Sequence, residues 1–169
     1  NDADHDRERL ERGTLDIGVL LGPTDISKYE SIVLPGKERW GVIVPAKCPL
    51  AQKEYVTKEV LVGRRVFIAK RGVAQGVADW FGEYYDKMNV YATYNLLYNA
   101  AMLVDCEVGA AITIEGASKL YHNPNIIFKP FYPELAVTST MVWKKHQPQT
   151  RAVSTFLEYV REKLNKDES

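Results

Sequence analysis

The most regular pattern of apolar and polar positions lies between Val90 and Gly116, where it predicts a strand followed by a helix. Val90–Thr93 is β-branched and aromatic, which is typical of a strand. From Leu96 to about Val104 the apolar residues recur at helical spacing. Asn95 precedes this run and is a suitable N-cap, because its side-chain oxygen can accept a hydrogen bond from a free N–H of the first turn.

A second strand follows this helix. Ala110–Ile114 is an almost wholly apolar run, and a strand without alternation is usually covered on both faces, as in a parallel sheet flanked by helices. A right-handed β-helix-β crossover accounts for the whole stretch. It places the N-terminus of a helix at the carboxyl end of a strand, where open α/β sheets bind ligands.

The same criteria predict the other elements, and their alternation indicates an α/β protein. Strands are expected at Leu15–Leu21, Ser31–Leu34, Trp40–Val44, Arg65–Ala69, Ile126–Phe131 and Leu135–Trp143. Helical segments are expected at Arg7–Arg12 with Gly13 as C-cap, at Thr57–Gly63, at Val73–Met88 and after Pro148.

The two ends of the chain do not complete a core by themselves. The strand Leu15–Leu21 has only a short helix before it, and the last helix has few local partners. We therefore expect a thin lobe of which a part lies outside this chain. The chain also opens with the charged run NDADHDRERLERG and without Met, so we expect it to begin inside a longer protein.

Composition narrows the functional classes. The 169 residues are 46% hydrophobic and carry 22 Lys plus Arg against 22 Asp plus Glu, a formal net charge of zero. A neutral balance argues against nucleic-acid binding by this segment alone, since phosphate contacts require a basic surface. Cys48 and Cys106 lack metal-type spacing and indicate reduced thiols, and no apolar run is long enough to span a membrane.

Five runs of sequence form a recognisable ordered set. They are ERLERGTLDIGVL, then ESIVLPGKERWGVIVPAKCPLA followed by VTKEVLVGRRVFI, then TYNLLYNAAMLVDCEVGAAITI, and finally VWKKHQPQTRAVSTFLEYVRE. In this order and spacing the set resembles the effector-binding (substrate-binding) domain of LysR-type transcriptional regulators. No single run is specific, but the ordered set is.

The resemblance implies a fold like that of a type 2 periplasmic binding protein, with two α/β lobes joined by two crossings and a small ligand in the cleft. Lobe one would comprise residues 1–36 and 132–169, and lobe two residues 37–131. It also implies that the first part of lobe one, and a winged helix-turn-helix that reads DNA, precede this chain. The part of lobe one expected upstream commonly holds the anionic group of the effector.

Two positions depart from the family pattern. The usual Gly-Leu-Gly at the helix exit is Glu107-Val108-Gly109 here, so the left-handed C-cap must be made by another residue or the turn must differ. The family's His-Pro-Leu-Ala is Cys48-Pro49-Leu50-Ala51.

The resemblance points to an effector site built from strand ends and helix starts. The corresponding residues are Leu21 and Gly22, then Ala69, Lys70, Arg71 and Gly72, and finally Thr93, Tyr94 and Asn95.

The residues themselves support a site for an anion, beside a plainer interpretation. Lys70 and Arg71 precede a predicted helix, where a carboxylate would meet two cations and free N–H groups. They could equally be two solvated cations of a turn. Asn95 could be only an N-cap, and the two roles can coexist. We expect Arg71→Ala to weaken the response to effector without unfolding the protein.

No residue pattern supports catalysis, a cofactor or a bound metal. One branch of the family senses peroxide, but its cysteines fall in the region matching residues 69–81, where this chain has none. Acidic neighbours raise the pKa of a thiol, so Cys106, between Asp105 and Glu107, is interpreted as structural. The histidines lie in a tail or in turns and form no catalytic set.

The sequence therefore predicts a non-enzymatic, cytoplasmic ligand-sensing domain of a LysR-type regulator. Its partners would be a small effector, mildly favoured to be anionic, further copies of itself in a homodimer or homotetramer, and DNA through the upstream domain. The alternative is a transporter-associated periplasmic solute-binding protein of the same fold, which would need an export signal.

Overall fold

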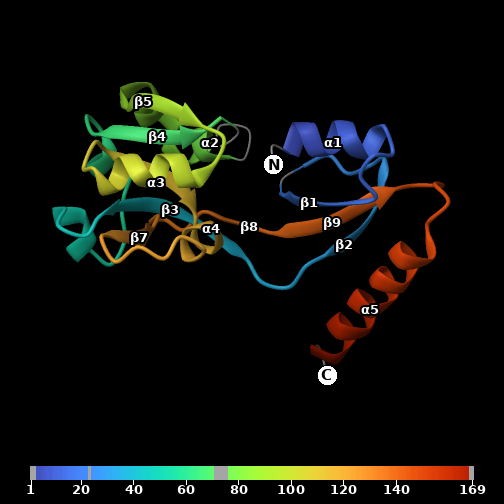
Figure 1. The fold of residues 1–169 in the computed structure, drawn as a ribbon. Helices are drawn as coiled ribbons and strands as arrows, with labels where there is room; N and C mark the ends of the chain where they lie inside the picture. The colour runs from blue at the N-terminus through green and yellow to red at the C-terminus, as the bar shows by residue number, and fades with distance from the viewer. Residues whose placement is uncertain (1–2, 23, 71–75, 168–169) are drawn as a thin grey trace. The chain divides into compact units, whose positions relative to one another are not determined.

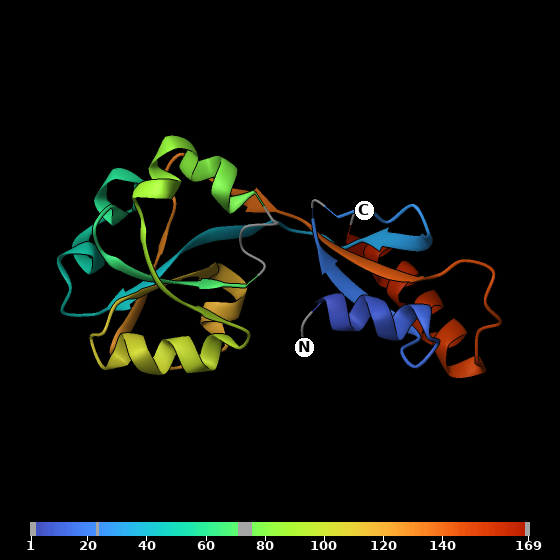
Figure 2. The same cartoon turned by 90° about the horizontal axis from the view of Figure 1, so that it is seen from above.

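The computed structural model describes residues 3–22, 24–70 and 76–167, and it divides the chain into two compact units (Figures 1 and 2). The first unit comprises residues 1–37 and 138–169, and the second comprises Glu38–Val137. The sequence placed the corresponding boundaries after residues 36 and 131.

The first unit contains a three-stranded antiparallel sheet in the order β1-β9-β2. Side chains alternate along β9, so that Val142 packs with Leu10 of α1 on one face while Met141 and Trp143 pack with Leu157 of α5 on the other. The elements are α1 Ala3–Glu11, β1 Ile17–Leu21, β2 Tyr29–Val33, β9 Ser139–Lys144 and α5 Arg151–Asp167.

The second unit is built on a mixed sheet in the order β5-β4-β6-β3-β7, with the short β8 paired to β3. Strand β4 is parallel to β5 and β6, whereas β3 is antiparallel to β6 and β7. The strands are β3 Glu38–Pro45, β4 Arg65–Ala69, β5 Asn89–Tyr94, β6 Ala110–Ile114, β7 Ile126–Pro130 and β8 Ala136–Val137. The helical segments are η1 Pro49–Gln52, η2 Glu59–Leu61, α2 Val77–Phe81, η4 Gly82–Lys87, α3 Leu97–Asp105 and α4 Glu115–Lys119.

Both faces of this mixed sheet are covered, as the apolar run of β6 predicts. Helix α3 lies on one face, where Ala100, Ala101 and Val104 pack against Phe67 of β4, and α2 lies on the other side in Figure 2. The first four residues of β6 are buried. The strand-helix-strand prediction for β5, α3 and β6 is therefore confirmed, and β4 lies between the two parallel strands.

Several predicted boundaries differ from the structure, most clearly at three elements. The expected helix Val73–Met88 is α2 followed by the 3-10 segment η4, because Gly82 with φ of +54° ends α2; Val73 itself lies outside the described residues. The expected N-cap Asn95 is replaced by Leu96, which has an extended backbone and makes no side-chain cap bond. The expected strand Leu135–Trp143 is divided into β8, which pairs with β3, and β9, which pairs with β1 and β2.

The C-terminal cap of α3 shows how this helix ends without the first glycine of the Gly-Leu-Gly pattern. Glu107 adopts the left-handed conformation with φ of +60°. Its N–H donates to the Val104 carbonyl at 2.9 Å, and the Val108 N–H donates to the Leu103 carbonyl at 3.0 Å. These two bonds form a Schellman motif in which a glutamate holds the position that glycine usually occupies.

Replacing Glu107 by glycine should therefore stabilise the chain. Glycine adopts positive φ without the steric cost of a Cβ, so we expect Glu107→Gly to raise the free energy of unfolding by about 0.5–1 kcal/mol. Urea denaturation followed by circular dichroism measures this change. Glu107→Ala is the control, because it removes the same carboxylate but keeps the Cβ; an equal gain for both variants would mean that backbone strain is not the cause.

Candidate ligand pocket at the carboxyl ends of two parallel strands

The second unit has a pocket of about 410 Å³ where β4 and β5 end and α3 begins. This is the edge of the sheet at which α/β folds commonly bind ligands. Its volume falls within the usual range for small-molecule sites. It is lined by Phe67, Lys70, Ala92, Thr93, Tyr94, Asn95, Asn99, Ala100 and Leu103.

The parallel pairing of β4 and β5 brings the polar residues of the pocket together. Ala69 lies opposite Tyr94 in the register, and the Lys70 N–H donates to the Tyr94 carbonyl at 3.1 Å. Because both strands run in the same direction, the chain leaves them side by side at Lys70 and Asn95. Residues separated by 25 positions in sequence thus line one pocket.

Four polar side chains in this pocket can meet a ligand. Lys70, Thr93, Asn95 and Asn99 are all exposed, and within the described part of the chain none of their side chains makes a hydrogen bond or ion pair. An ammonium group donates three hydrogen bonds, and each amide can both donate and accept. The pocket therefore offers a ligand one positive charge, two amides and the Thr93 hydroxyl.

Tyr94 supports the base of the pocket. Its hydroxyl donates to the carbonyl of Ile112 in the neighbouring β6 at 2.6 Å. Burial raises the pKa of Tyr94 to about 12, and a hydrogen bond with Thr113 offsets part of the rise. The phenol is therefore neutral near pH 7 and acts as a fixed donor that joins the end of β5 to the centre of the sheet.

The structure brings together four of the residues predicted from the sequence. Lys70, Thr93, Tyr94 and Asn95 line the pocket, and Ala69 ends β4 directly before it. Arg71 and Gly72 lie outside the described residues.

Leu21 and Gly22 belong to the other unit, at the end of β1. There the Gly22 N–H donates to the carbonyl of Thr138 at 2.9 Å, and the Leu21 carbonyl accepts a bond from the Thr24 hydroxyl at 2.8 Å. Their role in ligand binding stays a prediction.

The sequence did not point to the other five lining residues, which are Phe67, Ala92, Asn99, Ala100 and Leu103. Helical spacing could have found some of them, because Asn99 and Leu103 follow Asn95 at steps of four and lie on one face of α3. Phe67 and Ala92 were harder to foresee. The pairing of β4 and β5 shifts register between Val66 and Phe67, so simple alternation does not place Ala92 opposite Phe67.

Other candidate chemistry is sparse in the part of the chain that the structure describes. No group of three or more His, Cys, Asp or Glu side chains there could hold a metal ion. Cys48 and Cys106 are free thiols, and Cys106 is exposed at the end of α3. Within the same described residues, every helix is too short or too polar to cross a membrane.

Comparison with known proteins identifies the family. The sequence profile of the LysR substrate binding domain matches residues 1–165. The chain therefore belongs to the LysR substrate-binding domain family, the ligand-sensing regulatory domain of LysR-type transcription regulators, as the five resembling runs predict. No curated protein matches the chain.

Solved structures of regulators share the fold. The reduced OxyR regulatory domain from Pseudomonas aeruginosa is 22% identical with a TM-score of 0.72, over 95% of this chain and 79% of that chain. HinK, a LysR family transcriptional regulator from the same species, is 15% identical with a TM-score of 0.76, over 97% of this chain and 58% of that chain. A C-terminal domain of a probable LysR family regulator from Rhodococcus sp. RHA1 is 17% identical with a TM-score of 0.76, over 95% and 81%.

These comparisons confirm the α/β fold of the periplasmic-binding-protein type. They do not favour the alternative of an exported solute-binding protein, because the matching family and these structures are those of transcription regulators. The chain spans 55% of full-length OxyR from Pseudomonas aeruginosa and 58% of HinK.

The raised pKa of Tyr94 predicts a specific dependence of stability on pH. The folded state keeps the proton up to about pH 12 and the unfolded state releases it near pH 10, so this contribution is complete below pH 10 and is lost as pH rises towards 12. Tyr94→Phe should flatten the fall in the free energy of unfolding over that window. At neutral pH the free energy of unfolding of the same variant should be lower by about 1 kcal/mol, because the substitution removes the hydrogen bond to the Ile112 carbonyl.

Urea titrations at several pH values measure both effects of Tyr94→Phe. Tyr98→Phe is the matched control, since the Tyr98 side chain is 61% exposed, and its neutral-pH stability should stay within about 0.5 kcal/mol of the parent. Equal pH profiles for the parent and Tyr94→Phe would contradict the assignment.

Proposed function

We propose that the Lys70 pocket binds a small anionic metabolite and that this binding is the signal the domain senses. The supporting observation is the ammonium of Lys70 beside the amides of Asn95 and Asn99, at the carboxyl ends of two parallel strands, with no side-chain partner for any of the three among the residues that the structure describes. A carboxylate is the group that complements this set, because the ammonium and both amides can donate to its oxygens.

The residues around Lys70, Asn95 and Asn99 indicate what kind of molecule carries the carboxylate. The N-terminus of α3 carries free N–H groups and a partial positive charge, and its first turn has no acidic residue. Phe67, Ala100 and Leu103 add an apolar wall. A small carboxylate with an apolar portion fits this arrangement better than a cation or an extended polar sugar.

In the whole protein, the ligand would control how DNA is bound. We propose that the chain works in the cytoplasm as part of a homodimer or homotetramer, and that DNA is contacted by an N-terminal domain outside this chain. The expected cleft between two lobes, including Leu21 and Gly22, stays a prediction. Such a signal requires the ligand to bind one arrangement of the protein more tightly than another.

The coding sequence upstream of Asn1 tests this wider role. A region that encodes a winged helix-turn-helix with a basic recognition helix supports the regulator. A signal peptide directly before the domain would contradict it and would favour an exported solute-binding protein.

Self-association has support from an exposed apolar surface on α3 and the edge strand β5. Apart from Asp105, α3 carries no charged residue, and β5 is at the end of its sheet with one backbone edge unpaired. A second copy of the chain fits this surface, because the same apolar patch on both copies is self-complementary. The exposed apolar residues of this α3–β5 surface are Val90, Tyr91, Leu96, Tyr98, Met102 and Leu103.

Lys70→Gln should weaken ligand binding without changing the fold. We expect a loss of about tenfold or more in affinity, because an uncharged amide replaces the ammonium that meets the carboxylate. A thermal-shift screen of the chain against pyruvate, succinate and benzoate finds the probe, and isothermal titration measures its Kd in each variant.

Lys53→Gln is the control for this experiment, since it removes one exposed lysine of the same unit that does not line the pocket. If Lys53→Gln and Lys70→Gln reduce affinity equally, or if none of the three carboxylates binds, the anionic-ligand proposal fails.

Placing a charge on the α3–β5 surface should weaken self-association. We expect Tyr98→Glu to raise the dimer Kd by about tenfold or more, because a carboxylate would lose water where two copies meet. Sedimentation equilibrium of the chain measures this Kd. Phe156→Glu changes a residue of the other unit with a similar exposure of 47% and should leave association unchanged; a monomeric parent chain would contradict the proposal.

A further inference from the structure

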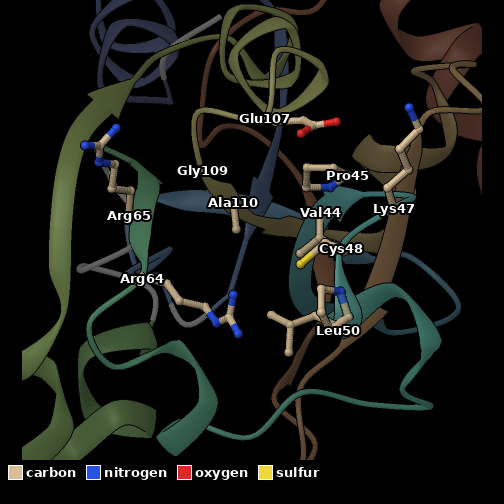
Figure 3. A pocket seen from close by; sticks show the side chains of 11 residues that line it. Val44, Pro45, Lys47, Cys48, Leu50, Arg64, Arg65, Glu107, Gly109 and Ala110 are labelled. Atoms are coloured by element: carbon tan, nitrogen blue, oxygen red, sulfur yellow. The ribbon is translucent and has the colours of Figure 1, made fainter.

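A second pocket lies at the opposite edge of the same mixed sheet. Its volume is about 330 Å³, and it is formed where β3 ends and where β4 and β6 begin (Figure 3). It shares no lining residue with the Lys70 pocket. The first and last residues of β4 are four positions apart, and each step along a strand advances the chain by about 3.3 Å, so the two edges lie about 13 Å apart.

The floor of this second pocket is apolar and firmly packed. Val44, Leu50 and Ala110 are 0%, 2% and 6% exposed. Gly109 allows β6 to begin close to β4, since a Cβ at this position would collide with the carbonyl oxygen of Arg65. A ligand would therefore rest on a preformed apolar surface, which keeps the conformational cost of binding small.

Arg64 provides a positioned charge at the side of this floor. Its Nε donates to the Val60 carbonyl at 2.9 Å, which holds the guanidinium in place. The side chain extends towards Leu50 and Cys48 in Figure 3. Among the described residues, neither terminal nitrogen has a hydrogen-bond or ion-pair partner. Two parallel N–H groups in this geometry match the two oxygens of a carboxylate.

The neighbouring Arg65 does not share this role. Its guanidinium lies over the ring of Tyr91, 5.1 Å from the ring centroid, and its side chain points away from Cys48 and Leu50 in Figure 3. The two adjacent arginines therefore differ in where they place the guanidinium, since only that of Arg64 faces the pocket floor. They form a matched pair for a substitution experiment.

Glu107 limits the charge of the ligand. Its carboxylate lies at the other side of the pocket, near Pro45, and has no ion-pair partner in the described part of the chain. A ligand with a second anionic group would meet this carboxylate, and like charges at close range repel. Lys47, an exposed lysine that also lines the pocket, offsets the charge of Glu107. Arg64 supplies the remaining positive charge, so the pocket favours one negative charge over two.

We propose that this pocket is a second ligand site, which binds a small monocarboxylate with an apolar body. The carboxylate meets the guanidinium of Arg64, and the body rests on Val44, Leu50 and Ala110. The site is separate from the Lys70 pocket and does not depend on the function proposed for it.

Cys48 allows this site to be tested directly. It lines the pocket and is partly exposed, whereas Cys106 is exposed and does not line it. Alkylation of the full 169-residue chain by iodoacetamide, followed by mass spectrometry of each thiol, reports occupancy. Hexanoate should slow alkylation of Cys48 in a saturable way and leave the rate at Cys106 unchanged, and neutral hexanamide should slow neither.

Matched variants identify the recognising group. Arg64→Gln should raise the hexanoate concentration needed for half-protection by about tenfold or more, and Arg65→Gln, with the same loss of charge, by less than about twofold. Glu107→Gln should lower this concentration. Lys70→Gln should leave it unchanged, which separates this result from any failure at the Lys70 pocket.

Three results would overturn the proposal. The first is an unchanged Cys48 alkylation rate at about 10 mM hexanoate, a concentration at which even a millimolar site would be mostly filled. The second is equal protection by hexanamide, which would exclude recognition of a carboxylate. The third is equal protection in the parent chain and in Arg64→Gln, with thermal unfolding confirming that the variant is folded.

Discussion

Strand β4 is the element on which the second unit depends, because it pairs in parallel with β5 on one side and with β6 on the other. Its central residues, Val66 to Ile68, are each at most 2% exposed and alternate between the two faces of the sheet. Parallel pairing gives the sheet one edge of strand carboxyl ends and one of strand amino ends. One pocket lies at each edge, with Lys70 directly after β4 and Arg64 directly before it.

Strand predictions from apolar runs bounded by turn residues were the most accurate. The bounds of β4 and β6 agree with prediction because each run is buried throughout its centre, so burial and sequence pattern coincide. Prediction failed where a local backbone conformation decided the outcome. Gly82 interrupts a good amphipathic stripe through its positive φ, and Glu107 adopts a conformation that its residue type disfavours. Periodicity carries no information about either.

The residues of the candidate site also fall into those that the sequence predicted and those that it did not. Lys70, Thr93, Tyr94 and Asn95 follow or end predicted strands, so the rule about strand ends was enough to find them. Asn99 lies within a helix that the sequence described only by its apolar spacing, and its polar side chain fell outside that description. The second pocket had no sequence signal, since Val44, Leu50, Arg64 and Ala110 come from four separate segments that only the sheet order brings together.

The elements that line the Lys70 pocket also carry the apolar surface proposed for self-association. Leu103 lines the pocket and is 41% exposed on α3, while Ala92 and Tyr91 are neighbours on β5 that belong to the pocket and to the α3–β5 surface respectively. A ligand that changes the spacing of β5 and α3 would therefore change the surface that a second copy meets. Coupling by this route is reciprocal, so association would alter ligand affinity by the same factor. On these two proposals, the shortest path from ligand to assembly would lie within the second unit, through two adjacent elements.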